Sequence, residues 1–256
     1  LSGAFGVEGL EPEQANVDKA RAHIRSLGFY GDVSVGRLEG NSLPYADDLV
    51  NLVVSRNLGD ISMDEVMRVL CPNGVALIRE NGKVSRTVKP WPDEIGEWTH
   101  YLQDASNNAV AADTKVGSPR RLKWTCGPLW TRDHEFNSSL CAMVSSNGRL
   151  FYIFDEGLTG VTPKSIPERW MLIARDAFNG KLLWKRPLTE WGSQTWKTRA
   201  LRNAPQTIPR RIVAQGDRLY IALGHNAPVS VLDAATGDIL TTFEQTEGTD
   251  EIRCCD

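Results

Sequence analysis

The first third of the chain alternates short apolar runs with stretches whose apolar residues recur at helical spacing. Residues 5–10, 49–54 and 75–78 are nearly all apolar, which is typical of strands buried on both faces. A helix is expected after Pro12, and a second helix is expected after a capping box at Ser62. This alternation of strands and helices predicts a parallel α/β architecture.

The pattern changes between residues 83 and 97. The run Lys89-Pro90-Trp91-Pro92 is stiff and extended, because each proline restricts its own φ and the residue before it. Beyond it the helical period disappears, and short strands separated by Gly, Asn and Asp turns take over. We therefore expect a first domain over 1–82, a linker over 83–97 and an all-β region over 98–256.

An internal repeat organises the all-β region. Residues 148–153 are echoed by 217–222, and residues 173–184 are echoed by 231–240. Each copy is consistent with two hairpins joined by a tight turn, and hence with one four-stranded antiparallel sheet. Sheets of this kind in tandem are the blades of a β-propeller, so the sequence predicts an incomplete propeller of about two blades with an unpaired outer edge.

Composition narrows the functional classes without choosing one. The 256 residues are 41% hydrophobic and 24% charged with a net charge of −3, which is ordinary for a globular protein and does not favour a nucleic-acid partner. No apolar run approaches the roughly 18 residues of a membrane helix. The five cysteines show no metal-ligand spacing, so we expect no metal site. Both ends fall inside the pattern, and we expect the chain to be a fragment.

Both copies of the internal repeat resemble a known family. Residues 174–184 look like the tryptophan-docking repeat of quinoprotein dehydrogenases, which bind pyrroloquinoline quinone (PQQ), and of related propellers, many of which bind no quinone and act as scaffolds. Residues 232–237 are similar, although Thr241 or Thr242 stands where the tryptophan would be. The resemblance implies that an Asp holds each turn, a Gly supplies positive φ and a Trp packs between blades; these residues are Asp176, Gly180, Trp184, Asp233 and Gly237.

The same resemblance implies PQQ with calcium as a cofactor of the full-length protein. Cys254-Cys255 is similar to an adjacent pair that forms a ring disulfide beside the quinone in some of these enzymes. The alternative is that the two cysteines are ordinary strand residues facing opposite sides. The catalytic Asp and the calcium ligands of such enzymes would lie on blades that this sequence does not contain.

Polar residues gather before and within the first predicted strand of the propeller. One hypothesis makes them a site at the propeller mouth, where a small molecule or a protein would bind or an acid/base pair would act. The other hypothesis is hydrogen-bonded packing of an irregular segment. The residues concerned are His100, Asp104, Asn108, Arg132, Asp133 and His134.

The first domain resembles a class I S-adenosylmethionine (SAM) methyltransferase. The resemblance implies a partial Rossmann-like fold and implies that Glu11, at the end of a strand, would accept both ribose hydroxyls of SAM. The alternative for Glu11 is a plain acidic residue at a helix N-terminus. The glycine-rich loop of that family is missing, so this stretch alone would not hold SAM. The similar segments are 7–21, 40–45, 48–54 and 65–74.

The combination of both halves, joined by residues 91–101, resembles bacterial PQQ-binding-like propeller repeat proteins. A binding or scaffold propeller fused to a methyltransferase-like domain is the favoured function. The alternatives are a SAM-dependent methyltransferase with a propeller for recruitment and a PQQ-dependent dehydrogenase, so enzymatic activity stays open. The propeller implies a periplasmic or cell-envelope location, whereas an active methyltransferase implies the cytoplasm.

Overall fold

The computed structural model describes residues 5–80, 82–115, 117–118, 122–128, 139–158, 167–196 and 207–255. The chain divides into two compact units, Leu1–Pro92 and Asp93–Asp256, and each unit is described by itself. Among the described residues, no helix is both long and apolar enough to cross a membrane.

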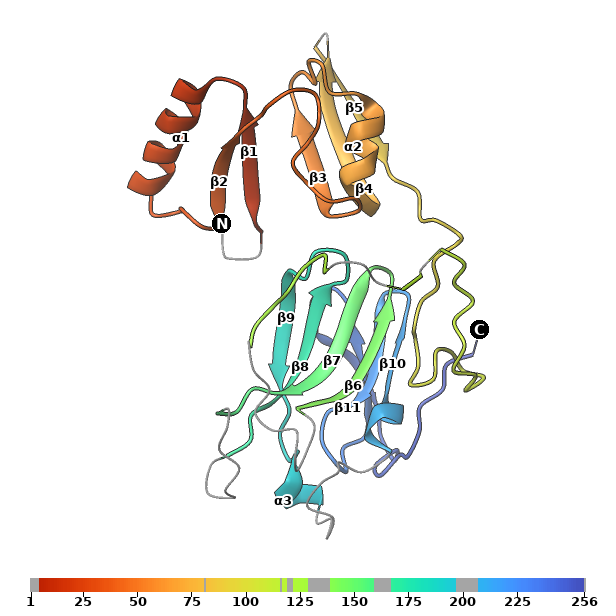
Figure 1. The fold of residues 1–256 in the computed structure, drawn as a ribbon. Coiled ribbons are helices and arrows are strands. Elements are labelled where there is room, and N and C mark those ends of the chain that lie inside the picture. The colour runs from red at the N-terminus through yellow and green to blue at the C-terminus, as the bar shows by residue number, and fades with distance from the viewer. Residues whose placement is uncertain are drawn as a thin grey trace. The chain divides into compact units, whose positions relative to one another are not determined.

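The first unit contains two small sheets, each with one helix (Figure 1). β1 pairs with β2 in parallel, β3 pairs with β4 in parallel, and β5 runs antiparallel along β4. Helix α2 begins at a capping serine, because the Ser62 hydroxyl accepts a hydrogen bond from the Glu65 N–H at 3.1 Å. The elements are β1 (Val7–Glu11), α1 (Gln14–Ser26), β2 (Val33–Arg37), β3 (Val50–Ser55), α2 (Met63–Val69), β4 (Leu70–Glu80) and β5 (Lys83–Val88).

The predicted α/β class, with its partial Rossmann-like methyltransferase fold, is wrong. The described part of the protein is mostly β, with 38% of the described residues in strands and 12% in helices, and the described strands form four separate sheets. The physical reason lies in the pairing. Among the described strands, no ladder joins β1 or β2 to β3 or β4, and β5 turns back along β4 inside the expected linker. The expected parallel sheet is therefore two short pieces.

The burial of β3 also differs from the prediction. Its apolar sequence predicted a strand covered on both faces, yet Leu52 is 53% exposed and Val54 is 68% exposed. Only one side of this sheet meets the apolar cluster of the unit, so alternate side chains of β3 face outward. The buried members of that cluster are Ile61, Val66, Leu70, Ala76 and Ile78.

The predicted turn at residues 72–74 is a bulge inside β4. The Asn73 N–H donates to the Lys89 carbonyl at 2.9 Å, and the Lys89 N–H donates to the Gly74 carbonyl at 2.9 Å. Pairing with β3 skips at this point, so the extra residues bulge while the strand continues. Gly74 permits the bulge, because an added Cβ would lie 2.7 Å from the Cys71 carbonyl oxygen.

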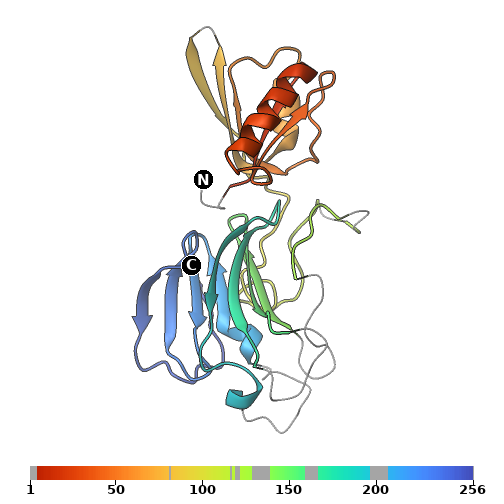
Figure 2. The same ribbon diagram turned by 90° about the vertical axis from the view of Figure 1, so that its left-hand side faces the viewer.

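The second unit contains two four-stranded antiparallel sheets in simple sequential order, seen side by side in Figure 2. Their facing sides share one apolar core that includes Phe151, Leu172, Leu219 and Leu232. Two short helical turns, α3 (Ser193–Trp196) and η1 (Ile208–Arg211), lie between the sheets in sequence. The strands are β6 (Leu140–Ser146), β7 (Arg149–Asp155), β8 (Trp170–Asp176), β9 (Leu182–Pro187), β10 (Ile212–Gln215), β11 (Arg218–Ala222), β12 (Val229–Asp233) and β13 (Ile239–Phe243).

The two sheets repeat one another in register. Arg149 pairs with Asp176 where β7 meets β8, and Arg218 pairs with Asp233 where β11 meets β12. In both sheets the pairing of the third and fourth strands shifts register at the equivalent place, between Ala174 and Arg175 in the first sheet and between Val231 and Leu232 in the second. Each sheet is an open meander, and the described strands form no closed barrel.

The turn between the third and fourth strands has the same geometry in both sheets. The Asp176 carboxylate accepts hydrogen bonds from the next backbone N–H groups of its turn at 2.8 and 3.0 Å, and the Asp233 carboxylate does so at 2.9 and 2.9 Å. The turns close at Gly180, with φ of 73°, and at Gly237, with φ of 77°, where the left-handed region favours glycine.

A tryptophan from the preceding part of the chain docks on each of these turns. The Trp124 indole N–H donates to the Ala177 carbonyl at 3.1 Å, and the Trp184 indole N–H donates to the Ala234 carbonyl at 3.1 Å. Trp184 lies so close to the second turn that a Cβ added at Gly237 would be 2.7 Å from its ring. The turn glycine and the docked ring therefore require each other.

Candidate functional site

A lead-in segment, residues 97–108, crosses the first strands of both sheets in the second unit. The Ser145 N–H donates to the Trp98 carbonyl at 2.7 Å, and the Ala214 N–H donates to the Thr99 carbonyl at 3.0 Å. Ser145 belongs to β6 and Ala214 belongs to β10. The segment therefore joins the two sheets and places His100 between them and the final residues of the chain.

His100 is a buried hydrogen-bonding link. Its side chain is 5% exposed, its Nδ1 lies 2.7 Å from the Thr99 hydroxyl, and its Nε2 accepts the Cys254 N–H at 3.1 Å. A backbone N–H only donates, so Nε2 carries no proton and the ring is neutral. Burial is the main cause that lowers the pKa of His100, with the nearby Arg253 charge adding to it and Asp104 and Glu251 opposing it.

Glu251 is the acidic centre of the same cluster. Its carboxylate accepts hydrogen bonds from Asn107 Nδ2 at 3.0 Å, Arg210 Nη1 at 3.2 Å and Arg253 Nη2 at 3.0 Å. The bonds from Arg253 and then Asn107 lower the pKa of Glu251 to about 2. The Arg210 guanidinium also lies over the Tyr101 ring, 5.4 Å from its centroid. Residues 250–255 are thus fastened to the lead-in segment.

The predicted polar residues separate into three groups. His100 joins the cluster, whereas Asp104 and Asn108 hold the lead-in segment itself. The Asp104 carboxylate accepts from the backbone N–H and hydroxyl of Ser106, which lowers the pKa of Asp104, and the Asn108 N–H donates to the Ser106 hydroxyl. The remaining predicted residues, Arg132, Asp133 and His134, lie outside the described residues.

Sequence reasoning missed Glu251, Arg210 and Arg253. They lie more than 100 residues from the lead-in segment, and no local pattern links them to it. The predicted pair Cys254-Cys255 does come to this place, with both thiols free. Burial is the main cause that raises the pKa of Cys254.

The described side chains of the cluster fasten the lead-in segment to residues 250–255. A neutral imidazole has one donor and one acceptor nitrogen, and both nitrogens of His100 are engaged. A general base needs an acceptor nitrogen within reach of its substrate. Within the described ranges, no group of three or more His, Cys, Asp or Glu side chains could hold a metal ion.

Glu11, the last residue of β1, accepts hydrogen bonds from the start of the helix that follows it. Its Oε1 accepts the Glu13 N–H at 3.1 Å and the Asn16 side-chain amide at 3.1 Å, at the start of α1. Binding both hydroxyls of a ribose would require acceptors on both oxygens of the carboxylate. Because one oxygen already serves the helix, the arrangement fits a helix N-terminal acid better than a SAM ligand.

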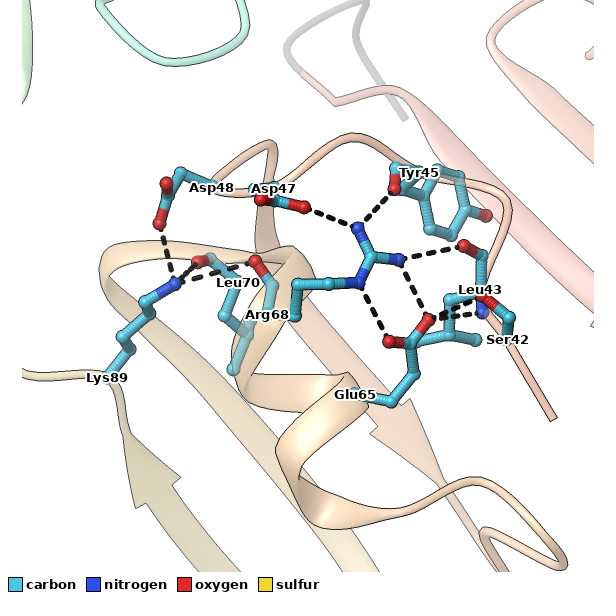
Figure 3. A network of polar contacts seen from close by, with 9 residues as sticks. All are labelled: Ser42, Leu43, Tyr45, Asp47, Asp48, Glu65, Arg68, Leu70 and Lys89. Atoms are coloured by element: carbon cyan, nitrogen blue, oxygen red, sulfur yellow. Dashed lines mark hydrogen bonds and ion pairs between the residues drawn. The ribbon is translucent and has the colours of Figure 1, made fainter.

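Arg68 organises the loop between β2 and β3 in the first unit. Its guanidinium donates five hydrogen bonds, which matches its full set of N–H groups: two to Glu65, one to Asp47 and one each to the Leu43 and Tyr45 carbonyls (Figure 3). The bond from Arg68, followed by that from the Leu43 N–H, lowers the pKa of Glu65 to about 2. This network is saturated and holds the loop on α2.

Two further contacts complete the fastening of this loop. Lys89 Nζ donates to the Asp48 carboxylate at 2.6 Å and to the Leu70 carbonyl at 2.7 Å (Figure 3). At the other end of the loop, burial and then the neighbouring Glu8 carboxylate raise the pKa of Tyr45. The loop therefore contacts both β1 and the β3–β5 sheet, which share no strand pairing.

The buried link at His100 predicts a pH-dependent stability. Its folded-state pKa lies below the ordinary value of 6.5, so its contribution is complete above about pH 6.5 and is lost as the pH falls below it. We expect His100→Gln, which keeps an acceptor for the Cys254 N–H, to flatten this part of the curve. Urea unfolding between about pH 5 and 8 measures it, and an unchanged slope in the variant would refute the assignment.

Comparison with known proteins adds little to this geometry. No family model matches the chain, and no curated protein matches it. Among solved structures, the crystal structure of the [4+2]-cyclase SpnF is similar at 27% sequence identity, over 31% of this chain and 33% of that one, with a TM-score of 0.28. The chain thus spans about a third of that protein's length. A likeness at this TM-score supports no conclusion about fold or function.

Proposed function

We propose that the chain is a binding or scaffold module whose second unit consists of two β-propeller blades of the PQQ-like type. The observation that carries this proposal is the repeated docking of one tryptophan on the next turn. Trp124 bonds the first Asp/Gly turn and Trp184 bonds the second, with the same 3.1 Å distance from the indole N–H to a carbonyl. Such docking is a device for stacking successive sheets.

The polar cluster supports a scaffold over an enzyme. The described polar side chains around His100 form hydrogen bonds that join the lead-in segment, the two sheets and residues 250–255. A catalytic site instead needs groups that are free to exchange protons or bind a reacting atom. The exposed rings of Trp98 and Tyr101 lie beside this cluster, and we propose this face as the one that meets a small molecule or a protein partner.

The two enzymatic alternatives have weaker support. The methyltransferase rested on a parallel α/β sheet that the strands do not form, and Glu11 is held by its own helix. For the PQQ-dependent dehydrogenase, the catalytic Asp and the calcium ligands of the family would lie on other blades, and His100, a candidate acid/base group, is engaged on both nitrogens. The described residues therefore lend the dehydrogenase no positive support.

Calorimetric titration of the chain tests the proposal. A scaffold is expected to give no saturable heat with SAM, and none with PQQ in the presence of calcium. Saturable binding of SAM would restore the methyltransferase, and saturable binding of PQQ would restore the dehydrogenase. For PQQ, His100→Gln is the control for binding at the cluster, since it removes the imidazole and keeps an acceptor for the Cys254 N–H.

A further inference from the structure

Five buried nitrogen atoms lack a hydrogen-bond partner among the described residues, and all five lie at one end of the second unit. Their residues lie at the start of β8, after the end of β9, before the start of β10 and between β11 and β12. These positions fall at the end of the unit where α3 lies in Figure 1. The atoms are Nε1 of Trp170, Trp191 and Trp196, Nε of Arg211 and Nδ1 of His225.

The three tryptophans form one contiguous cluster. The rings of Trp170 and Trp196 are 5.5 Å apart between centroids, and those of Trp191 and Trp196 are 6.3 Å apart. The side chains are 3%, 8% and 5% exposed for Trp170, Trp191 and Trp196. Leu188 and Ile208 belong to the same apolar core. These three indoles therefore combine an apolar surface with donors that water does not reach.

Arg211 and His225 connect to this cluster through the backbone. Arg211 Nη1 donates to the His225 carbonyl at 2.7 Å, and the His225 N–H donates to the Glu190 carbonyl at 3.2 Å, next to Trp191 in the chain. Among the described residues, the guanidinium also contacts the exposed carboxylate of Asp250, at 3.4 Å. Two hydrogen bonds thus connect this positively charged side chain to Glu190, the residue before Trp191.

Unpaired donors of this kind are costly to bury. Each one costs about 1–3 kcal/mol, and buried indole N–H groups normally find an acceptor. Trp124 and Trp184 in the same unit follow that rule, each with a carbonyl at 3.1 Å. A concentration of exceptions in one place indicates that an acceptor belongs there which the described residues do not supply.

The backbone around the cluster is also specialised. Gly192 has φ of 107°, and an added Cβ would clash with a Glu168 carboxylate oxygen and lie 2.9 Å from the unpartnered Trp170 nitrogen. Any larger residue at 192 would therefore displace the indole N–H or the carboxylate. The absence of a side chain at Gly192 leaves room for the Trp170 indole N–H and the Glu168 carboxylate.

We propose that the cluster of Trp170, Trp191 and Trp196 binds a small apolar molecule through a carbonyl or carboxylate oxygen. An indole N–H and an Arg Nε–H can only donate, so the ligand must supply the acceptor. The surrounding rings and aliphatic side chains favour an apolar body for the rest of the ligand. Arg211 would favour an anionic ligand and Glu168 a neutral one, because their charges are of opposite sign. Both kinds of ligand would present an oxygen that accepts a hydrogen bond. This site is separate from the His100 cluster and does not rest on the proposed function.

Three probes of one shape test the proposal on the full chain. Benzoate offers a charged acceptor, benzamide a neutral one, and benzylammonium offers donors alone on the same ring. Tryptophan fluorescence and thermal unfolding are the readouts. We expect a saturable response to benzamide or benzoate, and the stronger of the two identifies a neutral or an anionic ligand. No saturable response to either, or an equal response to benzylammonium, would overturn the proposal.

Variants that each remove one indole N–H locate the binding. Trp191→Phe and Trp196→Phe remove one unpartnered N–H each and keep a ring, so each is expected to weaken probe binding roughly three- to tenfold. Trp184→Phe is the matched control, because its N–H already bonds the Ala234 carbonyl. It is expected to lower the unfolding temperature and leave probe affinity unchanged. Equal loss of affinity in the control and the two variants would also refute the site.

Discussion

Replacing Gly237 by alanine is expected to lower the free energy of unfolding of the second unit by about 2–4 kcal/mol. Two effects add. The residue adopts φ of 77°, where a Cβ is strained, and the new methyl would lie 2.7 Å from the Trp184 ring. The ring must leave its place, and its hydrogen bond to the Ala234 carbonyl goes with it. Urea unfolding followed by tryptophan fluorescence measures the loss.

Gly248→Ala is the matched control for this prediction. Gly248 has φ of 71°, close to that of Gly237, but nothing lies within 4 Å of an added Cβ. It should therefore show only the backbone strain, about 1 kcal/mol. Equal losses for the two variants would mean that Trp184 does not occupy the turn. Gly180→Ala, whose Cβ would clash with the Trp124 ring, should behave like Gly237→Ala.

Replacing Arg68 by methionine is expected to lower the free energy of unfolding of the first unit by about 2–3 kcal/mol. The variant keeps an apolar side chain of similar length but leaves the Glu65 and Asp47 carboxylates and the Leu43 and Tyr45 carbonyls without their donor. Without Arg68 the pKa of Glu65 should rise from about 2 toward its usual range. Chemical unfolding monitored by circular dichroism measures the stability.

Arg37→Met serves as the control for Arg68→Met. The Arg37 side chain is largely exposed, and its ion pair with Glu39 spans 3.9 Å at the surface. Surface pairs of this kind contribute about 0–1 kcal/mol. The Glu65 contribution is present above its ordinary pKa and is lost as the pH falls toward 2, so wild type should lose stability over that range more steeply than Arg68→Met. Similar stabilities for both variants would contradict the network.

The local chemistry of the repeat could be predicted from the sequence, because it depends on residues close together in the chain. Asp176 and Gly180 are four positions apart, and their roles follow from side-chain acceptors and left-handed φ. The capping serine Ser62 is predictable for the same reason. The docking of Trp184 needed a resemblance to a known repeat, since its partner turn lies about 50 residues onward.

The α/β class was wrong because apolar runs do not specify which strands become neighbours. The sequence of β3 suits a strand with neighbours and cover on both sides, yet its described partner is β4 alone, and Leu52 and Val54 stay exposed. Likewise, the residue types at 72–74 are typical of a turn, but their backbone pairs with Lys89. They therefore form a bulge within one strand. Tertiary pairing overrode the local signal in both places.

The polar residues show the same limit. His100 was singled out from the sequence, but its partner is a backbone N–H more than 150 residues away. The three unpartnered indoles left no sequence signal at all, because whether a buried tryptophan N–H finds an acceptor is decided by the three-dimensional packing. Long-range contacts of this kind decide between a functional site and a structural link.

A double-mutant cycle between Trp184 and Gly237 tests the central claim most directly, namely that the β12–β13 turn of the second sheet is the docking position of a tryptophan from the first sheet. Removing the ring with Trp184→Ala should relieve the clash at Gly237→Ala, so the account predicts a coupling energy of about 1–3 kcal/mol for this pair. The pair Trp184 and Gly180 should be additive within about 0.5 kcal/mol. Additivity for Trp184 and Gly237 would contradict the account.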